Sequence, residues 1–258
     1  MLCGTRGKMR IAIVGYGKMG CLIRETALSQ GIEVPEVIDP FSTDPMVTSK
    51  DVCAQSLAGV DVVVEFSTPS VVVDHMKVYT KNGLDAVIGT TGWLDNLASV
   101  QQMVTASSSS VIYSGNYSIG VAVFLKLVQR AASMLGKAGG YDSGVLEMHH
   151  NRKADSPSGT ALMLAGEIEG AGCGKDRIVS EILHRRREDD EVQIASLRVG
   201  SLCGTHTVLF DSDADTIELT HRAKSRQGFA SGAVLAAKWI SGQKPGLYTL
   251  DDMIAQMI

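Results

Sequence analysis

The sequence has few aromatic residues, no excess of positive charge and no long uninterrupted apolar run. Hydrophobic residues make up 45% of the 258 residues and charged residues 20%, proportions that exclude a disordered chain. Aromatic residues account for only 5%, so the core must be mainly aliphatic. The formal net charge of −4 argues against a nucleic-acid-binding protein held by bulk positive charge.

Cysteine spacing and apolar segments exclude further classes of protein. The 5 cysteines are scattered, and no pair has the C-x-x-C spacing of a redox or zinc site, so we expect reduced thiols and no bound metal. Lys126 and Lys238 interrupt the two most apolar stretches, and the run 11–14 is too short for the core of a signal peptide. We therefore expect a cytoplasmic protein without a membrane partner.

Glycine, by contrast, is abundant. The chain has 27 glycines but only 6 prolines, so the excess does not indicate a low-complexity linker. In the first half, short β-rich runs alternate with helical stretches, which predicts a parallel α/β sheet. The expected strands are 9–14, 34–38, 60–66, 85–88 and 111–113. The expected helices are 18–30, 70–82 and 94–107.

The pattern changes after Tyr117. Strands are expected at 143–148, 192–199, 206–210 and 216–220, the last three with hairpin spacing. Helices are expected at 121–135, 157–169, 232–240 and 250–258. The second part therefore favours an α+β fold with a mostly antiparallel sheet, whose open face could serve as an interface.

A G-x-G-x-x-G sequence lies between the first expected strand and the first expected helix: Gly15, Tyr16, Gly17, Lys18, Met19 and Gly20. Its first glycine permits a tight turn, its second lets the backbone approach a pyrophosphate, and its third lets helix and strand pack closely. The N–H groups at the start of the helix add an anion site. The pattern predicts a Rossmann-type dinucleotide-binding domain. The alternative is a glycine-rich structural turn.

The residue that would bind the adenine ribose is Asp39, which ends the second expected strand roughly 20 residues after the fingerprint. Its carboxylate would repel the 2′-phosphate of NADPH, and its neighbours Pro40 and Phe41 supply no cation to neutralise one. We therefore expect NADH to be preferred and NADPH to be the second choice. In the alternative reading, Asp39 only caps a helix.

Small residues also lie at the ends of the third and fourth expected strands, 60–66 and 85–88, at the sheet edge where open α/β sheets bind ligands. They suit the close approach of a nicotinamide ring and ribose, although each group could also be a simple turn. The positions assigned to the cofactor are Phe66, Ser67, Thr68, Gly89, Thr90, Thr91, Ser114, Asn116 and Tyr117.

The segment 147–162 carries the densest chemistry in the chain. His149 and His150 directly follow an expected strand, and the cations of Arg152 and Lys153 come next. An expected helix N-terminus then offers donors from Ser158, Gly159 and Thr160. This combination is fit to hold a carboxylate-bearing substrate and to supply a proton from His or Lys. The alternative for the histidine pair alone is a solvated loop.

On these motifs, the sequence resembles the dihydrodipicolinate reductase family over nearly its whole length. The most distinctive match is E-x-H-H-x-x-K-x-D-x-P-S-G-T-A, from Glu147 to Ala161. Further matches are the fingerprint, the segments 89–92 and 116–120, Arg198-Val199-Gly200, Gly204-Thr205-His206, Thr220-His221, Ser225-Arg226 and Phe229-Ala230.

The resemblance implies an enzyme of lysine and diaminopimelate biosynthesis that reduces a cyclic, unsaturated imine dicarboxylate with NAD(P)H to tetrahydrodipicolinate. By motif position, His149 and Lys153 resemble the proton donors. The substrate carboxylate contacts would be His150, Lys153, Ser158, Gly159 and Thr160. It further implies a dinucleotide-binding domain at 1–118, a substrate and tetramerisation domain at 119–228, a segment at 229–258 that returns to the first domain, and a homotetramer.

Pro40 stands where family members often carry an arginine, which places NADPH use in doubt. The charged run 184–191 has no clear counterpart in the family, and a solvated, self-neutralising loop is the expected explanation. Two other functions stay open: a different nicotinamide-dependent reductase on the same fold, and a non-catalytic dinucleotide-binding sensor. The cluster at 149–160 argues against both.

Overall fold

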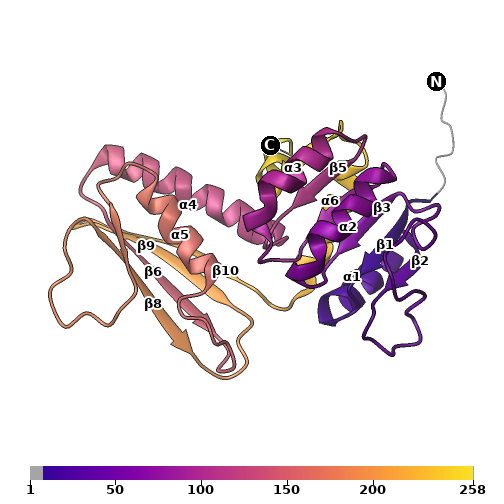
Figure 1. Ribbon diagram of the computed structural model, residues 1–258. Coiled ribbons are helices and arrows are strands. Elements are labelled where there is room, and N and C mark those ends of the chain that lie inside the picture. Colours follow the sequence, from indigo (N-terminus) through magenta and orange to yellow (C-terminus); the bar gives the residue numbers. More distant parts are fainter. Residues whose placement is uncertain (1–7, 258) are drawn as a thin grey trace. The chain divides into compact units, whose positions relative to one another are not determined.

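The computed structural model describes residues 8–257, which form two compact units. The first contains residues 8–119 and 227–257, and the second is Gly120–Arg226 (Figure 1). The C-terminal segment therefore belongs to the unit that begins the chain.

A parallel sheet of six strands forms the centre of the first unit, in the order β11-β5-β4-β3-β1-β2. Its strands are β1 (Arg10–Val14), β2 (Glu33–Ile38), β3 (Val62–Glu65), β4 (Asp85–Ile88), β5 (Ser110–Tyr113) and β11 (Gly246–Thr249). The central strands are continuous apolar runs because helices cover both faces of a parallel sheet. In β1, for example, Ile11, Ala12 and Ile13 are fully buried.

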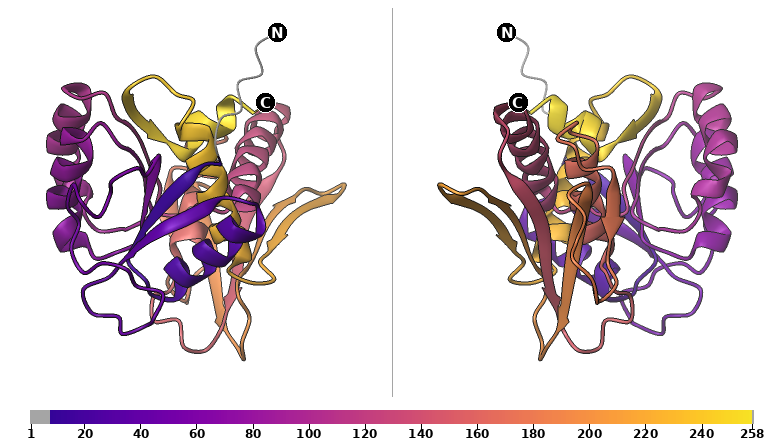
Figure 2. Two further views of the ribbon diagram at one scale, coloured as in Figure 1. Left: turned by 90° about the vertical axis from the view of Figure 1, so that its right-hand side faces the viewer. Right: turned by 90° about the vertical axis from the view of Figure 1, so that its left-hand side faces the viewer.

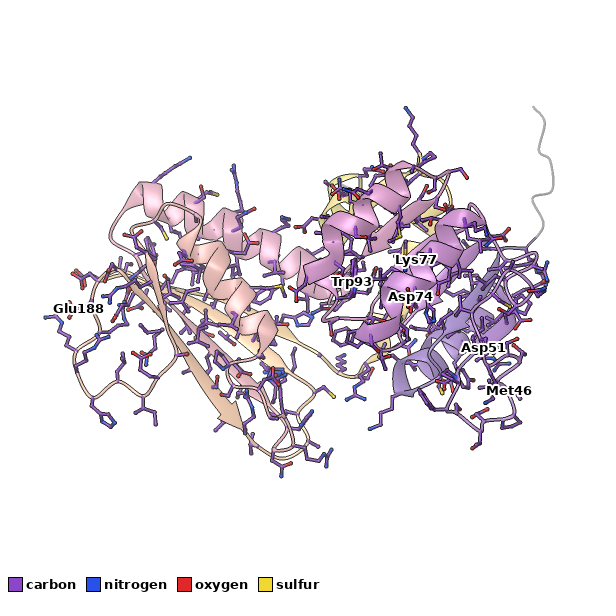
Figure 3. All side chains as sticks on the ribbon, in the orientation of Figure 1. Met46, Asp51, Asp74, Lys77, Trp93 and Glu188 are labelled. Atoms are coloured by element: carbon purple, nitrogen blue, oxygen red, sulfur yellow. The ribbon has the colours of Figure 1, made fainter. Side chains whose placement is uncertain are left out.

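The helices of this unit are α1 (Lys18–Ser29), α2 (Pro69–Lys81), η1 (Leu94–Asn96), α3 (Leu97–Thr105), α6 (Gln227–Ile240) and α7 (Leu250–Ala255). Helix α6 packs on α1 and on the central strands, whereas α2 and α3 pack on each other along the opposite face (Figure 2). On that opposite face, Val72, Met76 and Val100 join a buried cluster with the strands. On the surface of α2, Asp74 pairs with Lys77 (Figure 3).

The second unit holds a five-stranded sheet in the order β10-β9-β6-β8-β7. Its elements are α4 (Ile119–Ala138), β6 (Asp142–His149), α5 (Gly159–Glu169), β7 (Arg177–Val179), β8 (Glu191–Arg198), β9 (Thr205–Asp211) and β10 (Thr216–Arg222). Both helices contribute to a core on one face of this sheet, where Phe124 and Val128 of α4 meet Leu164 of α5 and Val208 of β9.

The α/β class with a parallel sheet and a second α+β unit is confirmed, with one difference in strand pairing. The hairpin of β9 and β10 forms as expected. The expected hairpin between 192–199 and 206–210 does not form, because β6 lies between β8 and β9. Strand β8 pairs in parallel with β6, after a crossover that includes α5, so the sheet is mixed.

Helix α4 is the one helix among residues 8–257 that is long and apolar enough, by length and composition, to cross a membrane. The expectation that Lys126 excludes such a stretch was therefore too strict. The helix has an apolar side in the core of the second unit, at Phe124, Val128 and Ala132. Core helices pass the same length and composition test as spans, so this finding is weak evidence for a membrane segment.

The charged run 184–191 forms most of the loop that joins β7 to β8, where Glu188 is labelled in Figure 3. Arg185 Nη2 lies 2.6 Å from Glu191 Oε1, and Arg187 pairs with Asp142 at the start of β6. Hydrogen bonds from Arg185 hold the pKa of Glu191 well below its usual value, at about 2. The Arg185–Glu191 pair confirms the expectation of a self-neutralising loop, whereas Arg187 is neutralised by a carboxylate outside the run.

Candidate active site

The cofactor positions expected from the sequence all lie just beyond strands β1 to β5, at the carboxyl edge of the parallel sheet. Because these strands are parallel, residues far apart in the chain gather along one edge. Tyr16 and Asp39 follow β1 and β2, Ser67 and Thr90 follow β3 and β4, and Asn116 follows β5.

The glycine-rich turn has the geometry that a pyrophosphate site needs. Gly15 has a φ of +89°, and a Cβ placed there would lie 2.2 Å from the carbonyl oxygen of Phe66. A Cβ on Gly20 would lie 2.1 Å from the carbonyl oxygen of Gly15, whereas one on Gly17 would meet nothing within 4 Å. Helix α1 begins without a side-chain cap, so its first N–H groups stay available to an anion.

Asp39 connects this turn to the loop after β2. Its Oδ2 accepts the Tyr16 N–H at 2.7 Å, and its Oδ1 accepts the N–H groups of Phe41 and Ser42 at 2.8 and 2.7 Å. Burial alone would raise the pKa of Asp39, but these hydrogen bonds and the charge of Lys50 hold it below its ordinary value. A carboxylate has about four acceptor sites, so one remains for a ribose hydroxyl.

Lys50 supplies a cation that the sequence neighbours of Asp39 do not. Its Nζ donates to the carbonyl oxygens of Asp39 at 3.3 Å and Ser42 at 2.6 Å. Because Lys50 is eleven residues from Asp39, only the return of the loop brings its charge to this site. The charge at Asp39 therefore depends on Lys50 as well as on the neighbours Pro40 and Phe41.

The turns after β3, β4 and β5 support one another. The Ser67 N–H donates to Thr90 Oγ1 at 2.9 Å, and a Cβ on Gly89 would lie 2.2 Å from the ring of Phe66. Tyr117 is 1% exposed and its hydroxyl donates to the carbonyl oxygens of Ile88 and Ile112, so its side chain is committed to the fold. Of the positions after β5, Ser114 and Asn116 share a turn in which Ser114 Oγ donates to the Asn116 carbonyl oxygen at 2.9 Å.

In the second unit, the end of β6 brings Glu147 and His149 to the face of the sheet that α5 covers. They are two residues apart in one strand and therefore point to the same side. Glu147 pairs in register with His206 of β9, and His149 pairs with Arg198 of β8. Glu147 is 0% exposed, and His149 and His206 are also buried.

These side chains form one hydrogen-bonded cluster, which we call the Glu147 cluster: Glu147, His149, Ser158, Arg198 and His206. His149 Nδ1 bonds to Glu147 Oε2, and Arg198 Nη2 donates to Glu147 Oε1 at 2.7 Å. His206 Nε2 lies 3.0 Å from Ser158 Oγ, and the His149 and His206 rings meet edge to face with centroids 5.0 Å apart.

Burial shifts the pKa values of His149 and His206 in the same direction. Burial lowers the pKa of His149 below its ordinary value, and the opposing charge of Glu147 only partly offsets this. Burial and repulsion from His149 lower the pKa of His206 to about 4, so His206 is neutral near pH 7. Both shifts favour the neutral imidazole in the resting protein.

Three ligand atoms from Glu147, His149 and His206 lie within 4.8 Å of one another, a separation that a metal site would accept. The charges argue against a cation, because Arg198 already donates to Glu147 and the His149 Nδ1 takes the other oxygen. The residues therefore fit a metal ion poorly.

The loop after β6 carries the remaining predicted residues. Lys153 Nζ donates to both carboxylate oxygens of Asp155, at 2.7 and 2.8 Å. His150 has a buried Nδ1 without a hydrogen-bond partner, a polar atom that a ligand could satisfy. Gly159 and Thr160 begin α5, and Ser158 caps it by accepting the Ala161 N–H at 3.2 Å.

Ser158 is only 2% exposed, and its hydroxyl is already held by Ala161 and His206. The structure thus places Ser158, Gly159 and Thr160 at the N-terminus of α5, with Gly159 and Thr160 more open than Ser158, whereas His150 and Lys153 lie in the loop before it. Sequence reasoning assigned no role to Glu147, Arg198 or His206, although all three lie in matched motifs. The sequence did offer a signal for Glu147. It lies two residues before His149, and at that spacing in a strand both side chains point to the same face of the sheet.

The comparisons with known proteins cover both units. A family model described as the N-terminus of dihydrodipicolinate reductase matches residues 9–117, and one for its C-terminus matches residues 120–254. The chain belongs to the dihydrodipicolinate reductase family. It is accordingly an oxidoreductase, and membership decides against the sensor reading.

Curated and solved members of this family resemble the chain over almost its full length. The 4-hydroxy-tetrahydrodipicolinate reductase of Christiangramia forsetii is 36% identical, with 96% of this chain and 99% of that protein covered. The enzyme of the same name from Methanococcoides burtonii is 38% identical, with 92% and 95% covered. A dipicolinate-bound dihydrodipicolinate reductase from Paenisporosarcina sp. TG-14 has a TM-score of 0.79 at 25% identity, with 96% and 100% covered.

Proposed function

We propose that this chain catalyses the NAD(P)H-dependent reduction of dihydrodipicolinate, formed from 4-hydroxy-tetrahydrodipicolinate, to tetrahydrodipicolinate in lysine and diaminopimelate biosynthesis. The observation that carries the proposal is the fold of the segment 147–160, which joins a buried histidine–carboxylate pair to a helix N-terminus. The dipicolinate held by the solved relative supports a planar dicarboxylate as the ligand class.

The residues of the two units have different tasks in this proposal. When bound to the first unit, NADH supplies the hydride. In the second unit, His149 and Lys153 supply the proton that the reduced ring requires, since both are nitrogen acids, one at the end of β6 and the other in the loop after it. Burial of His149 favours its neutral form, so a protonated His149 readily gives up its proton.

The substrate carboxylates would bind at the start of α5. Its first-turn N–H groups lack helical partners, and the helix dipole favours an anion there. Gly159 and Thr160 occupy these positions, while His150 offers its unpartnered Nδ1. Lys153 adds positive charge and would exchange its contact with Asp155 for the substrate.

Pyridine-2,6-dicarboxylate, a planar mimic of the substrate, is expected to compete with it. Replacing Thr160 by alanine removes one hydroxyl donor and should raise the inhibition constant by ~10- to 100-fold, the equivalent of one hydrogen bond to a charged group. Thr105→Ala at the exposed end of α3 is the matched control. Inhibition kinetics measure the effect, and a chain indifferent to the mimic would bind another substrate.

NADH is proposed as the preferred cofactor, with NADPH as the second choice, because the Asp39 carboxylate meets the adenine ribose. The support is the position of Asp39 beside the glycine-rich turn, where Tyr16 donates to it.

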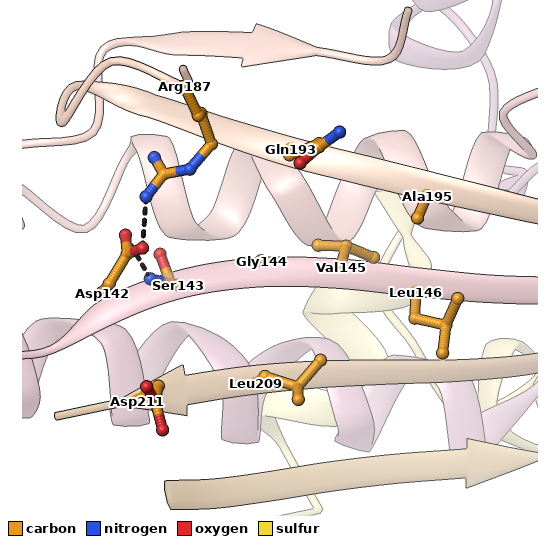
Figure 4. Close-up of a pocket in the computed structure, with 10 residues that line it drawn as sticks. All are labelled: Asp142, Ser143, Gly144, Val145, Leu146, Arg187, Gln193, Ala195, Leu209 and Asp211. Carbon is orange, nitrogen blue, oxygen red and sulfur yellow. Dashed lines mark hydrogen bonds and ion pairs between the residues drawn. The ribbon is translucent and has the colours of Figure 1, made fainter. Parts of the chain in front are cut away.

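We also propose a cytoplasmic homotetramer with no nucleic-acid or membrane partner. Support for the assembly comes from the sheet face opposite α5, the open sheet face, where Leu146 and Leu197 are 36% and 48% exposed. A hollow of about 390 Å³ lies on this face, and Figure 4 labels Leu146, Ala195 and Leu209 among the residues that line it. Exposed aliphatic side chains on an open sheet suit contact with a second copy of the chain.

A further inference from the structure

Glu147 lies at the centre of the buried polar cluster, although the proposed reaction uses it for no step. It is in β6, with His206 of β9 opposite it on one side and Ser196 of β8 on the other. Its carboxylate is fully buried, and a buried carboxylate is costly unless donors satisfy both oxygens.

Both carboxylate oxygens of Glu147 have hydrogen-bond partners, and the partners of the two oxygens are different residues. His149 Nδ1 bonds to Oε2, while Oε1 receives Arg198 Nη2 at 2.7 Å and, at the longer distance of 3.4 Å, the Ser158 N–H. Burial alone would raise the pKa of Glu147, but hydrogen bonds from Arg198, Ser196 and His149 hold it below its usual value. The group is therefore a carboxylate that only accepts hydrogen bonds.

This contact determines which nitrogen of His149 is free. A carboxylate acceptor requires Nδ1 to carry a proton, so only Nε2 can gain or lose one. Nε2 faces Gly204, where a Cβ would lie 2.9 Å away, and the φ of +145° at this position also favours glycine. The side of His149 that must exchange a proton is thus kept clear of any side chain at residue 204.

Arg198 extends the connection to the loop that carries Lys153. The same Nη2 atom that bonds to Glu147 also donates to the carbonyl oxygen of Asp155 at 2.7 Å. Asp155 in turn holds Lys153 through its carboxylate. One buried ion pair therefore positions both residues proposed as proton donors.

We propose that Glu147 is a positioning residue: together with Arg198 it fixes His149 in the tautomer whose Nε2 delivers the proton, and its own negative charge stabilises the protonated ring. The inference rests on the proposed function only for the proton-donating role of His149. The tautomer it assigns can be observed in the resting protein.

The charges around His149 define the expected direction of a pH effect. Glu147 on its own strand raises the pKa of His149, whereas Arg198 of β8 and Lys153 of the loop lower it, and neutral His206 of β9 packs against its ring. Activity that needs protonated His149 declines as the pH rises through this pKa. Removing the Glu147 charge should therefore move the decline in kcat to lower pH, and removing the Arg198 charge should move it to higher pH.

The test is the pH profile of kcat for Glu147→Gln and Arg198→Gln, with Glu169→Gln at the exposed end of α5 as the matched control. Glu147→Gln should lower kcat ~10-fold near neutral pH and move the decline to lower pH. Arg198→Gln should move the decline to higher pH, and the control should leave it unchanged. A purely structural role would lower thermal stability in both variants without opposite shifts, which would overturn the proposal.

A second measurement tests the proposal even if Glu147→Gln or Arg198→Gln does not fold. Nitrogen-15 NMR of histidine-labelled wild-type protein, with His149 assigned by its loss in His149→Gln, reports which ring nitrogen carries the proton. We expect protonated Nδ1 in the neutral ring, and a neutral His149 protonated on Nε2 would refute the inference. A protein with the expected tautomer but no reductase activity would contradict the proposed function instead.

Discussion

Replacing Lys153 by alanine is expected to lower kcat by ~10²-fold or more while NADH binding stays intact. The expectation follows from general acid catalysis, in which one positioned donor contributes ~10²- to 10⁴-fold. Lys153 is suited to this task because its side chain is only 22% exposed and Asp155 holds its Nζ in place. The cofactor residues belong to the other unit, so the substitution should leave them unchanged.

Lys137→Ala is the matched control, since it removes the same group from the exposed end of α4. Steady-state kinetics give kcat, and fluorescence titration gives the dissociation constant for NADH. Lys153→Arg, which keeps the charge but not the acidity of the ammonium, should recover substrate binding more than kcat. An unchanged kcat in Lys153→Ala would remove Lys153 from the mechanism.

NADPH is expected to be used with a kcat/KM ~10- to 100-fold below that of NADH. The 2′-phosphate would remove the ribose hydroxyl that Asp39 is proposed to bind, which costs about one charge-assisted hydrogen bond, and would place two anions together. Asp39 cannot turn away without losing the Tyr16, Phe41 and Ser42 N–H contacts that hold it. Kinetics with both cofactors measure the ratio, and equal or better efficiency with NADPH would refute the preference.

The same comparison of NADH and NADPH tests the role of Lys50, which is a cation beside Asp39. Lys50→Met should reduce NADPH efficiency further and make the remaining activity with NADPH less sensitive to salt, while NADH kinetics change little. Lys77→Met on the exposed surface of α2 is the control. A parallel loss with both cofactors would assign Lys50 to the loop structure alone, through its bonds to the Asp39 and Ser42 carbonyl oxygens.

Periodicity was sufficient to predict most of the fold. Continuous apolar runs and helical stripes located β1 to β5 and their helices, because local sequence decides such elements. It missed β11, whose four residues have no alternation and gain their strand conformation by pairing with β5. It also misassigned the partner of β8, because strand order depends on long-range packing and not on the spacing between neighbouring strands.

The candidate site, like the fold, could be predicted from the sequence only in part. Motif spacing located the glycine-rich turn and the segment from His149 to Thr160, where the chemistry is contiguous in sequence. It could not show that Arg198, 51 residues from Glu147, meets it in the core. Nor could it show that the loop after β2 returns Lys50 to Asp39. Such contacts arise from strand register and loop closure, which a single sequence does not encode in any short pattern.

Reductase activity toward dihydrodipicolinate is measured by a coupled assay with dihydrodipicolinate synthase, in which the purified protein is mixed with NADH and the freshly formed synthase product. We expect loss of NADH absorbance only when the synthase and its substrates are all present, and inhibition by pyridine-2,6-dicarboxylate. If neither NADH nor NADPH is consumed by a folded protein that still binds NADH, the assignment is contradicted.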